Sequence, residues 1–472
     1  MNSFMNMVAM SICFGVGQGC LTAVLVLSPM YIDVRLFSFA AGTLYLTFAL
    51  GAVVSPLIVL KLGLLHSLVG GLLSYAVFVA AFLVPSLFSL LPAAVLAGGF
   101  GAALWTAQGV YLTRNAVLYA HDCGPDADRH MALSCLASAF TAINAVILAL
   151  AKAASSVVTS TVSVSPSYLY AIYLLLAVLA AGAMTQVLPL DTENDVFRRF
   201  QCSNKGLRGF ASSVWVALYT TFMANTNDLR MVLMIPTNMA FGTMAAYFPL
   251  VVTELVRSGL GEVDVGWLYA VSGIAGAILA VAYGVLAEVI GDRHGRAVVM
   301  VIGALSFGAI CAFVLFSRDS NSFTLTEMVI LFILYGSGNA VWQGTCMALF
   351  SEYWSSVPEV AFANLKFHSG LSSAIAFYIL PVVPGLWWRS LVCFVTVIFG
   401  VTTYMACHWV HLSHWTCTLE RGSQPQGSFI NNPLSSSSPA VPIDGKLSIS
   451  GDIQGSQENT EQLLCENEAL ST

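Results

Sequence analysis

The sequence has few charged side chains. Of its 472 residues, 9% are Asp, Glu, Lys or Arg, while 57% are apolar. A soluble domain carries about 25% charged residues, so this chain lacks the side chains to cover a water-facing surface, and we expect it to be embedded in lipid. Its net charge of -6 argues against nucleic acid as a partner, because nucleic-acid binding needs clustered positive charge.

Patterns typical of enzymes, cofactors and metal sites are also missing. No phosphate-binding loop, metalloprotease His pair or nucleophile motif occurs, so we expect neither an enzyme nor a cofactor. The 11 cysteines are odd in number and show no zinc-ligand spacing, which predicts neither a disulfide framework nor a metal site. The first ten residues contain no Lys or Arg, so the first apolar run is predicted to be a retained span and not a signal peptide.

Long apolar stretches, by contrast, are abundant. A helix that crosses the hydrocarbon core needs about 20 mostly apolar residues, and continuous runs of this length exclude the alternating pattern of a membrane β-barrel. The predicted fold is therefore an all-α polytopic membrane protein with 12 transmembrane helices. We place the spans at 3–25, 37–60, 67–86, 89–113, 131–153, 167–187, 230–254, 265–287, 297–316, 326–350, 366–384 and 386–409.

The spacing of the spans predicts two six-helix halves, 1–188 and 230–411. The longest internal break, 189–229, is predicted to be a cytoplasmic linker with one interfacial helix. Residues 412–472 are rich in Ser and acidic residues, which predicts a disordered cytoplasmic tail. If the N-terminus is inside, most Lys and Arg residues outside the spans fall in cytoplasmic loops, so both termini are predicted to face the cytoplasm. The choice between plasma membrane and endosomal membrane stays open.

One short pattern occurs in both halves, in the fourth and the tenth span. Two glycines and a tryptophan recur there at identical spacing, as Gly99, Gly101, Trp105 and Gly336, Gly338, Trp342. Such repeats in transporters surround a central cavity. Glycines allow helices to approach closely, and the tryptophans are candidate cavity residues, with ordinary packing as the alternative.

A charged turn follows the eighth span. It resembles the cytoplasmic signature of the major facilitator superfamily, in which a tight turn carries charges that pair with a neighbouring helix end and hold an inner gate closed. The corresponding first-half loop, 61–66, keeps only a basic residue and a glycine. A short cytoplasmic loop can also carry such charges by topology alone. The predicted gate residues are Gly284, Glu288, Asp292, Arg293, Gly295 and Arg296.

Further patterns occupy residues 101–113 in the fourth span, 339–343 in the tenth, 361–366 and, more weakly, 230–236. They resemble one branch of that superfamily, the ion-channel regulatory, uncoordinated-ninety-three-like family. The seventh span departs from the pattern after Gly242, and no Asn-x-Ser/Thr glycosylation sequon occurs. The resemblance implies a major-facilitator-type bundle that regulates ion channels or escorts other membrane proteins.

Amide and indole side chains away from the span ends are further candidates for lining a pathway, because polar groups are costly in lipid. Hydrogen bonding between helices is the alternative use of the amides. The candidate cavity residues are Gln18, Trp105, Gln108, Asn144, Asn238, Asn339, Trp342 and Gln343.

No Asp, Glu or His is predicted near the centre of a span, which argues against strong proton coupling. Two functions remain. The first is a regulator or escort that binds a membrane channel or receptor, with a role in ion homeostasis. The alternative is a facilitator or secondary transporter that moves a small solute by alternating access. The expected partners are accordingly the lipid bilayer, a channel or receptor, and a small solute.

Overall fold

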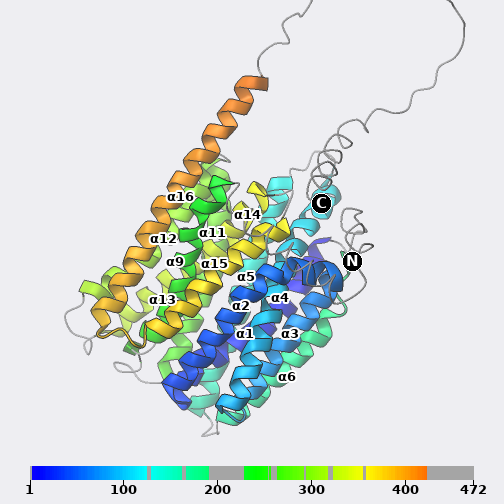
Figure 1. Ribbon diagram of the computed structural model, residues 1–472. Helices are drawn as coiled ribbons and strands as arrows, with labels where there is room; N and C mark the ends of the chain where they lie inside the picture. The colour runs from blue at the N-terminus through cyan, green and yellow to red at the C-terminus, as the bar shows by residue number, and fades with distance from the viewer. Residues whose placement is uncertain are drawn as a thin grey trace, which may run out of the picture. The chain divides into compact units, whose positions relative to one another are not determined.

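The computed structural model describes residues 3–124, 129–161, 166–190, 228–252, 255–256, 263–291, 294–316, 323–354 and 358–422. Contacts divide the chain into two units, Met1–Thr418 and Leu419–Thr472. The first unit is a bundle of long helices (Figure 1). No strand occurs in the described ranges, which confirms the all-α prediction.

Six helices form the first part of the bundle. Asp33 starts the second of them, because its carboxylate accepts hydrogen bonds from the backbone N–H groups of Arg35 and Leu36. Gly63 separates the second from the third with a φ of 82°, which glycine adopts without steric cost. The helices are α1 Ser3–Tyr31, α2 Val34–Leu62, α3 Leu64–Ala81, α4 Leu87–Cys123, α5 Arg129–Thr161 and α6 Pro166–Met184.

The second part contains the remaining helices, two of which continue into π-helical turns. A capping box at Thr324 and Glu327 begins the helix that leads into the second π-helical turn. Gly385, with a φ of 76°, precedes the last helix. The elements are α9 Leu229–Tyr247, η1 Phe248–Val252, α11 Val263–Ile290, α12 Gly295–Phe316, α13 Leu325–Ala340, η2 Val341–Cys346, α14 Met347–Tyr353, α15 Pro358–Ile379 and α16 Leu386–Gly422.

Eleven stretches of these helices are long and apolar enough to cross a membrane. The eleventh predicted span, 366–384, is the exception. It corresponds to α15, which begins earlier, at Pro358, and ends earlier, at Ile379. Asn364, Lys366 and His368 interrupt the apolar sequence of this helix. The arrangement of exactly 12 spans in two halves therefore stays a prediction.

The predicted domain boundaries fall partly outside the described residues. Most of the linker predicted at 189–229 lies there, together with its interfacial helix. The helix α16 continues to Gly422, past the predicted start of the tail at 412. The rest of that tail lies outside the described residues as well.

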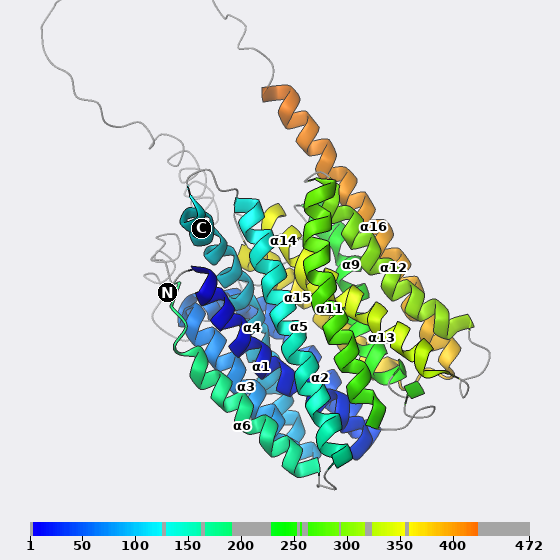
Figure 2. The ribbon, with the colours of Figure 1, turned by 180° about the vertical axis from the view of Figure 1, so that it is seen from behind.

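The two parts of the bundle meet mainly through two helix pairs. One pair is α2 with α15, which lie side by side in Figure 1. The other is α5 with α11, seen together in Figure 2. The helices that carry the residues discussed below therefore face one another across the middle of the bundle.

Candidate functional site

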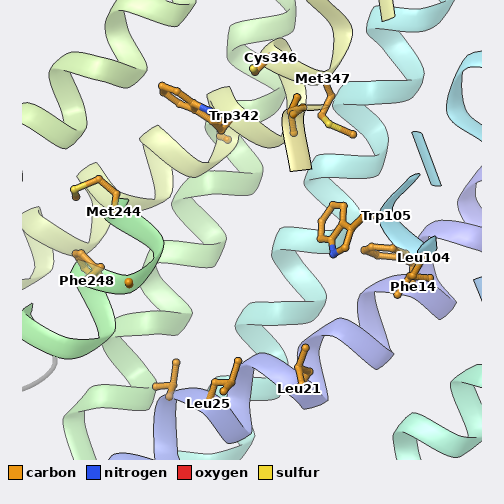
Figure 3. Packing of buried hydrophobic residues seen from close by; sticks show 14 of the residues in the cluster. Phe14, Leu21, Leu25, Leu104, Trp105, Met244, Phe248, Trp342, Cys346 and Met347 are labelled. Carbon is orange, nitrogen blue, oxygen red and sulfur yellow. The ribbon is translucent and has the colours of Figure 1, made fainter. Parts of the chain in front are cut away.

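The two repeated tryptophans have matching surroundings. Trp105 of α4 packs edge-on against Phe14 of α1, with ring centroids 4.8 Å apart. Trp342 of η2 stacks on Phe241 of α9 at 5.7 Å. In each part of the bundle the tryptophan therefore contacts a phenylalanine from the first helix of that part. Figure 3 shows the two indoles on separate helices.

A cavity of about 230 Å³ lies between the two parts of the bundle. Side chains from α1 to α5 line it from the first part, and side chains from α9, η1, α11, α13, η2 and α15 line it from the second. Most lining groups are aliphatic or aromatic, and a few are polar. Such a composition is typical of small-molecule sites.

Five of the eight predicted cavity residues line this space. The structure brings together Gln18, Trp105, Asn339, Trp342 and Gln343. Their role in binding stays a prediction.

The other three predicted cavity residues, Gln108, Asn144 and Asn238, are fully buried and do not line the cavity. Neither amide atom of Gln108 has a hydrogen-bond partner in the described part of the chain. Asn144 donates from its Nδ2 to the Oε1 of Gln343 across the two parts of the bundle, at 3.1 Å. For Asn144 the structure thus supports the alternative expectation, hydrogen bonding between helices.

The polar atoms at the cavity differ in whether they have partners. Asn339 donates to the carbonyl oxygen of Tyr335 on its own helix, at 3.1 Å. The Nε1 of Trp342 and the Oε1 of Gln18 are buried without a hydrogen-bond partner among the described residues. The indole N–H of Trp342 and the amide oxygen of Gln18 are therefore unused by the protein, but both atoms are themselves buried.

Two lysines in the cavity wall were missed by the sequence analysis. Lys366 is only 8% exposed, and its Nζ lies 3.9 Å from the centre of the Trp105 ring. The Nζ of Lys152 lies 4.6 Å from the centre of the Tyr269 ring. Both lysines line the cavity; Lys152 is on α5, which corresponds to the fifth predicted span, and Lys366 on α15, which corresponds to the eleventh.

The predicted spans 131–153 and 366–384 place Lys152 and Lys366 at span ends, because a charged residue lowers the mean hydropathy of the stretch around it. In the structure α5 continues to Thr161 and α15 begins at Pro358, so both lysines lie within helices. Apolar residues occur on both sides of each lysine, such as Ala361 before Lys366. This pattern could have indicated that the lysines lie inside the helices.

No Asp or Glu lines the cavity as far as the chain is described. No cluster of three or more potential metal ligands occurs in that part of the chain either. The site therefore combines two basic groups, unpaired polar atoms and aromatic faces. Chemically it suits a negatively charged molecule better than a cation.

The predicted gate lies at one end of the contact between α5 and α11. A Cβ at Gly284 would lie 2.8 Å from the Oγ of Ser138 on α5, and 3.6 Å from its Cβ. The guanidinium of Arg296 forms an ion pair with Glu352 of α14. Glu288 is exposed, and Gly291 has a φ of 98°.

Gly295 packs against the carbonyl oxygen of Ala287, so no side chain would fit there. Asp292 and Arg293 lie outside the described residues. The arrangement links α12 to α14 and α11 to α5, and its role as a gate stays a prediction.

Glycines continue this contact along α11 as a close-packed seam, which we call the α5–α11 seam. A Cβ at Gly273 would lie 2.5 Å from the Cβ of Ala149, and one at Gly266 would lie 2.7 Å from the carbonyl oxygen of Lys152. From Gly266 to Gly284 the helix rises about 27 Å, close to the roughly 30 Å of the hydrocarbon core. The two helices are therefore in contact over nearly the whole span.

The fold and site define the class: a multi-pass, all-helical integral membrane protein with an internal cavity. Residues 35–405 match the sequence model of the family described as ion channel regulatory protein UNC-93. The chain belongs to this family, and the match extends from α2 to α16.

Individual relatives agree with this assignment. UNC93-like protein 3 of Arabidopsis thaliana is 26% identical over 72% of this chain and 73% of its own length. Protein unc-93 homolog A of Bos taurus is 27% identical over 74% of this chain and 81% of its own length. The Homo sapiens homolog A is 24% identical with the same coverage.

Proposed function

We propose that this protein binds an ion channel in the same membrane and regulates it. The observation that carries the proposal is the family match, because residues 35–405 contain nearly the whole helical bundle. Regulation is then a property of the bundle and not of an added domain. The partner is a membrane channel, reached through the lipid bilayer.

The α5–α11 seam supports a bundle that works without rocking. Alternating access requires the two halves to separate first at one end and then at the other. In the α5–α11 seam, Gly266 and Gly284 are both in close contact with α5, although they lie at opposite ends of the span. The hydrogen bond between Asn144 and Gln343 adds a polar link in between.

The cavity wall gives separate support. Coupling to protons or metal cations commonly uses a carboxylate inside the membrane. None lines the cavity in the described ranges. A regulator needs no such group, and its two halves can act as one body.

We also propose that both termini face the cytoplasm and that residues 1–188 and 230–411 form the two halves. The distribution of Lys and Arg among the loops supports this orientation. Sequons inserted into the loop after α1 and into the loop after α2 test it. Only the loop after α1 is expected to be glycosylated, and glycosylation of the loop after α2 instead would contradict the orientation.

A disulfide lock separates regulation from transport. Ser138 and Gly284 have Cβ positions 3.6 Å apart, within the usual range for a disulfide. The variant S138C/G284C would therefore fix one end of the α5–α11 seam when oxidised. The single variants S138C and G284C are the matched controls, because Cys123 and Cys135 are exposed thiols that an oxidant also reaches.

The experiment has two steps. Crosslinking in native membrane and affinity capture of the full-length chain should recover a channel subunit in stoichiometric amount. Currents of that channel are then recorded with and without this protein, and with the oxidised lock. We expect the locked protein to change the current as the unlocked one does. The proposal is overturned if no channel is recovered, if the current is unaffected, or if only the reduced lock is active.

A further inference from the structure

The cavity contains positive charge that the protein does not neutralise. Lys152 and Lys366 both line it, and neither has an ion-pair partner within the described part of the chain. Lys366 is 8% exposed, so water reaches it poorly. A buried ammonium group costs several kcal/mol unless it is paired.

Aromatic rings compensate for only part of this cost. The ammonium of Lys366 lies over Trp105 and that of Lys152 over Tyr269. A cation–π contact is worth less than the burial of a charge costs. The thiol of Cys346 acts electrostatically on Lys366, but a thiol is ordinarily uncharged at neutral pH. An anion would balance this positive charge.

The remaining wall indicates what kind of anion fits. Trp342 also lines the cavity, but its N–H, which has no hydrogen-bond partner among the described residues, is itself buried in the protein. Phe37, Phe48 and Phe377 also line the cavity, and such apolar faces suit a ligand with a hydrophobic body. A strongly hydrated inorganic ion would leave these faces unused.

We infer that the cavity binds a small organic carboxylate. Its negative charge pairs with Lys366 and is further stabilised by Lys152, while its apolar body lies against the aromatic wall. Because Lys152 belongs to α5 and Lys366 to α15, the ligand contacts both parts of the bundle. This site goes beyond the proposed channel regulation and does not depend on it.

Purified full-length protein in detergent tests the inference by thermal unfolding with three probes of similar shape. Benzoate carries the negative charge, benzamide is neutral and benzylammonium is positive. A ligand that binds the folded state raises the unfolding temperature. We expect benzoate to do so in a concentration-dependent way, and benzamide and benzylammonium to have no comparable effect.

Variants assign the effect to the cavity. K366M and K152M remove the charge and keep an unbranched side chain, and K61M, on an exposed lysine at the end of α2, is the control. Loss of a charge-assisted contact weakens binding about tenfold to a hundredfold. We expect that loss for benzoate in K366M, a smaller loss in K152M, and none in K61M.

The source of the ligand is resolved by a fourth probe, octanoate. Stabilisation by octanoate more than by benzoate identifies a lipid-derived carboxylate, and the reverse identifies a water-soluble aromatic one. Equal effects of benzoate and benzamide on the unmodified chain would overturn the inference even if K366M failed to fold. Unchanged benzoate binding in folded K366M would overturn it too, whatever the channel recordings show.

Discussion

Adding one methyl group to the α5–α11 seam should separate the two parts of the bundle. In Gly273→Ala the new Cβ would lie 2.5 Å from the Cβ of Ala149 and 2.8 Å from the carbonyl oxygen of Ala145. Ordinary contacts of a Cβ begin at 3.4 Å. The second of the two contacted atoms is backbone and cannot rotate away, so α5 and α11 must move apart locally by about 1 Å.

The structure sets the size of the effect. Overpacking of this kind costs about 1–3 kcal/mol, and a gap of 0.5–1 Å forfeits a quarter to a half of each neighbouring dispersion contact. Alanine gains back up to about 1 kcal/mol, because it favours a helix more than glycine does. We expect Gly273→Ala to lower the free energy of unfolding by about 1–2 kcal/mol.

Gly182→Ala in α6 is the matched control, because nothing lies within 4 Å of the added Cβ there. It should leave stability unchanged or raise it by up to about 1 kcal/mol. Once accessible thiols such as Cys123 and Cys135 have been blocked with an unlabelled maleimide, unfolding in mixed micelles can be followed through the buried thiols of Cys311 and Cys393, which react with a fluorescent maleimide only after opening. A second change, Ala149→Gly, should restore part of the stability of Gly273→Ala.

The seam would be refuted by equal stability of Gly273→Ala and Gly182→Ala. Failure of Ala149→Gly to restore any stability would show instead that the loss arises elsewhere in α11. The two results are distinguishable because the comparison with Gly182→Ala tests whether the added methyl group is crowded, and Ala149→Gly tests whether Ala149 is the residue that crowds it.

Two further predictions concern charges at the ends of helices. Asp228 caps α9 and binds Arg230 and Trp354. Burial raises the pKa of its carboxyl, but these hydrogen bonds have the larger combined effect, so the pKa lies below its ordinary value. The contribution of Asp228 to stability is therefore present above about pH 4 and lost as pH falls further. The difference in unfolding temperature between the unmodified chain and Asp228→Asn should shrink below that pH, and a constant difference would contradict the assignment. The second prediction concerns Arg296 and Glu352, which form an ion pair. A double-mutant cycle of Arg296→Gln and Glu352→Gln should give a coupling of up to about 1 kcal/mol, whereas zero coupling would show that the pair contributes nothing.

Composition and the length of the apolar stretches were sufficient to predict the helical fold, because the hydrophobic length of a span can be read directly along the sequence. The repeat around Trp105 and Trp342 was also visible in one dimension, and the structure gives both indoles a phenylalanine partner from the first helix of their own part. The first pair of repeated glycines differs, since a Cβ at Gly99 would have nothing within 4 Å, whereas Gly336 packs against the backbone of Ser272 on α11. The second pair matches, because Gly101 packs against the ring of Tyr75 on α3 and Gly338 against the ring of Phe307 on α12. Equal spacing thus preserved some contacts and not others.

The composition of the site depended on the side of each helix that faces the cavity, which spacing alone does not give. Gln108 is one turn from Trp105 on α4, yet only the tryptophan lines the cavity. Lys152 and Lys366 were missed for a related reason. A predicted span ends where a charged residue lowers the hydropathy, whereas the helix itself continues past that residue. The α5–α11 seam was equally hidden, because a glycine pattern on α11 has meaning only beside the residues of α5 that face it.

The seam and the cavity meet at Lys152, which connects ligand binding with the state of the bundle. Its carbonyl oxygen lies 2.7 Å from where a Cβ at Gly266 would be, and its ammonium lies over Tyr269, also on α11. A carboxylate that paired with Lys152 and Lys366 would therefore connect α5, α11 and α15 and add to the contact that the α5–α11 seam already makes. By linkage, a channel that binds the ligand-loaded bundle more tightly than the empty one would raise the affinity for the ligand by the same factor. A metabolite in the cavity would then regulate the channel without ever crossing the membrane.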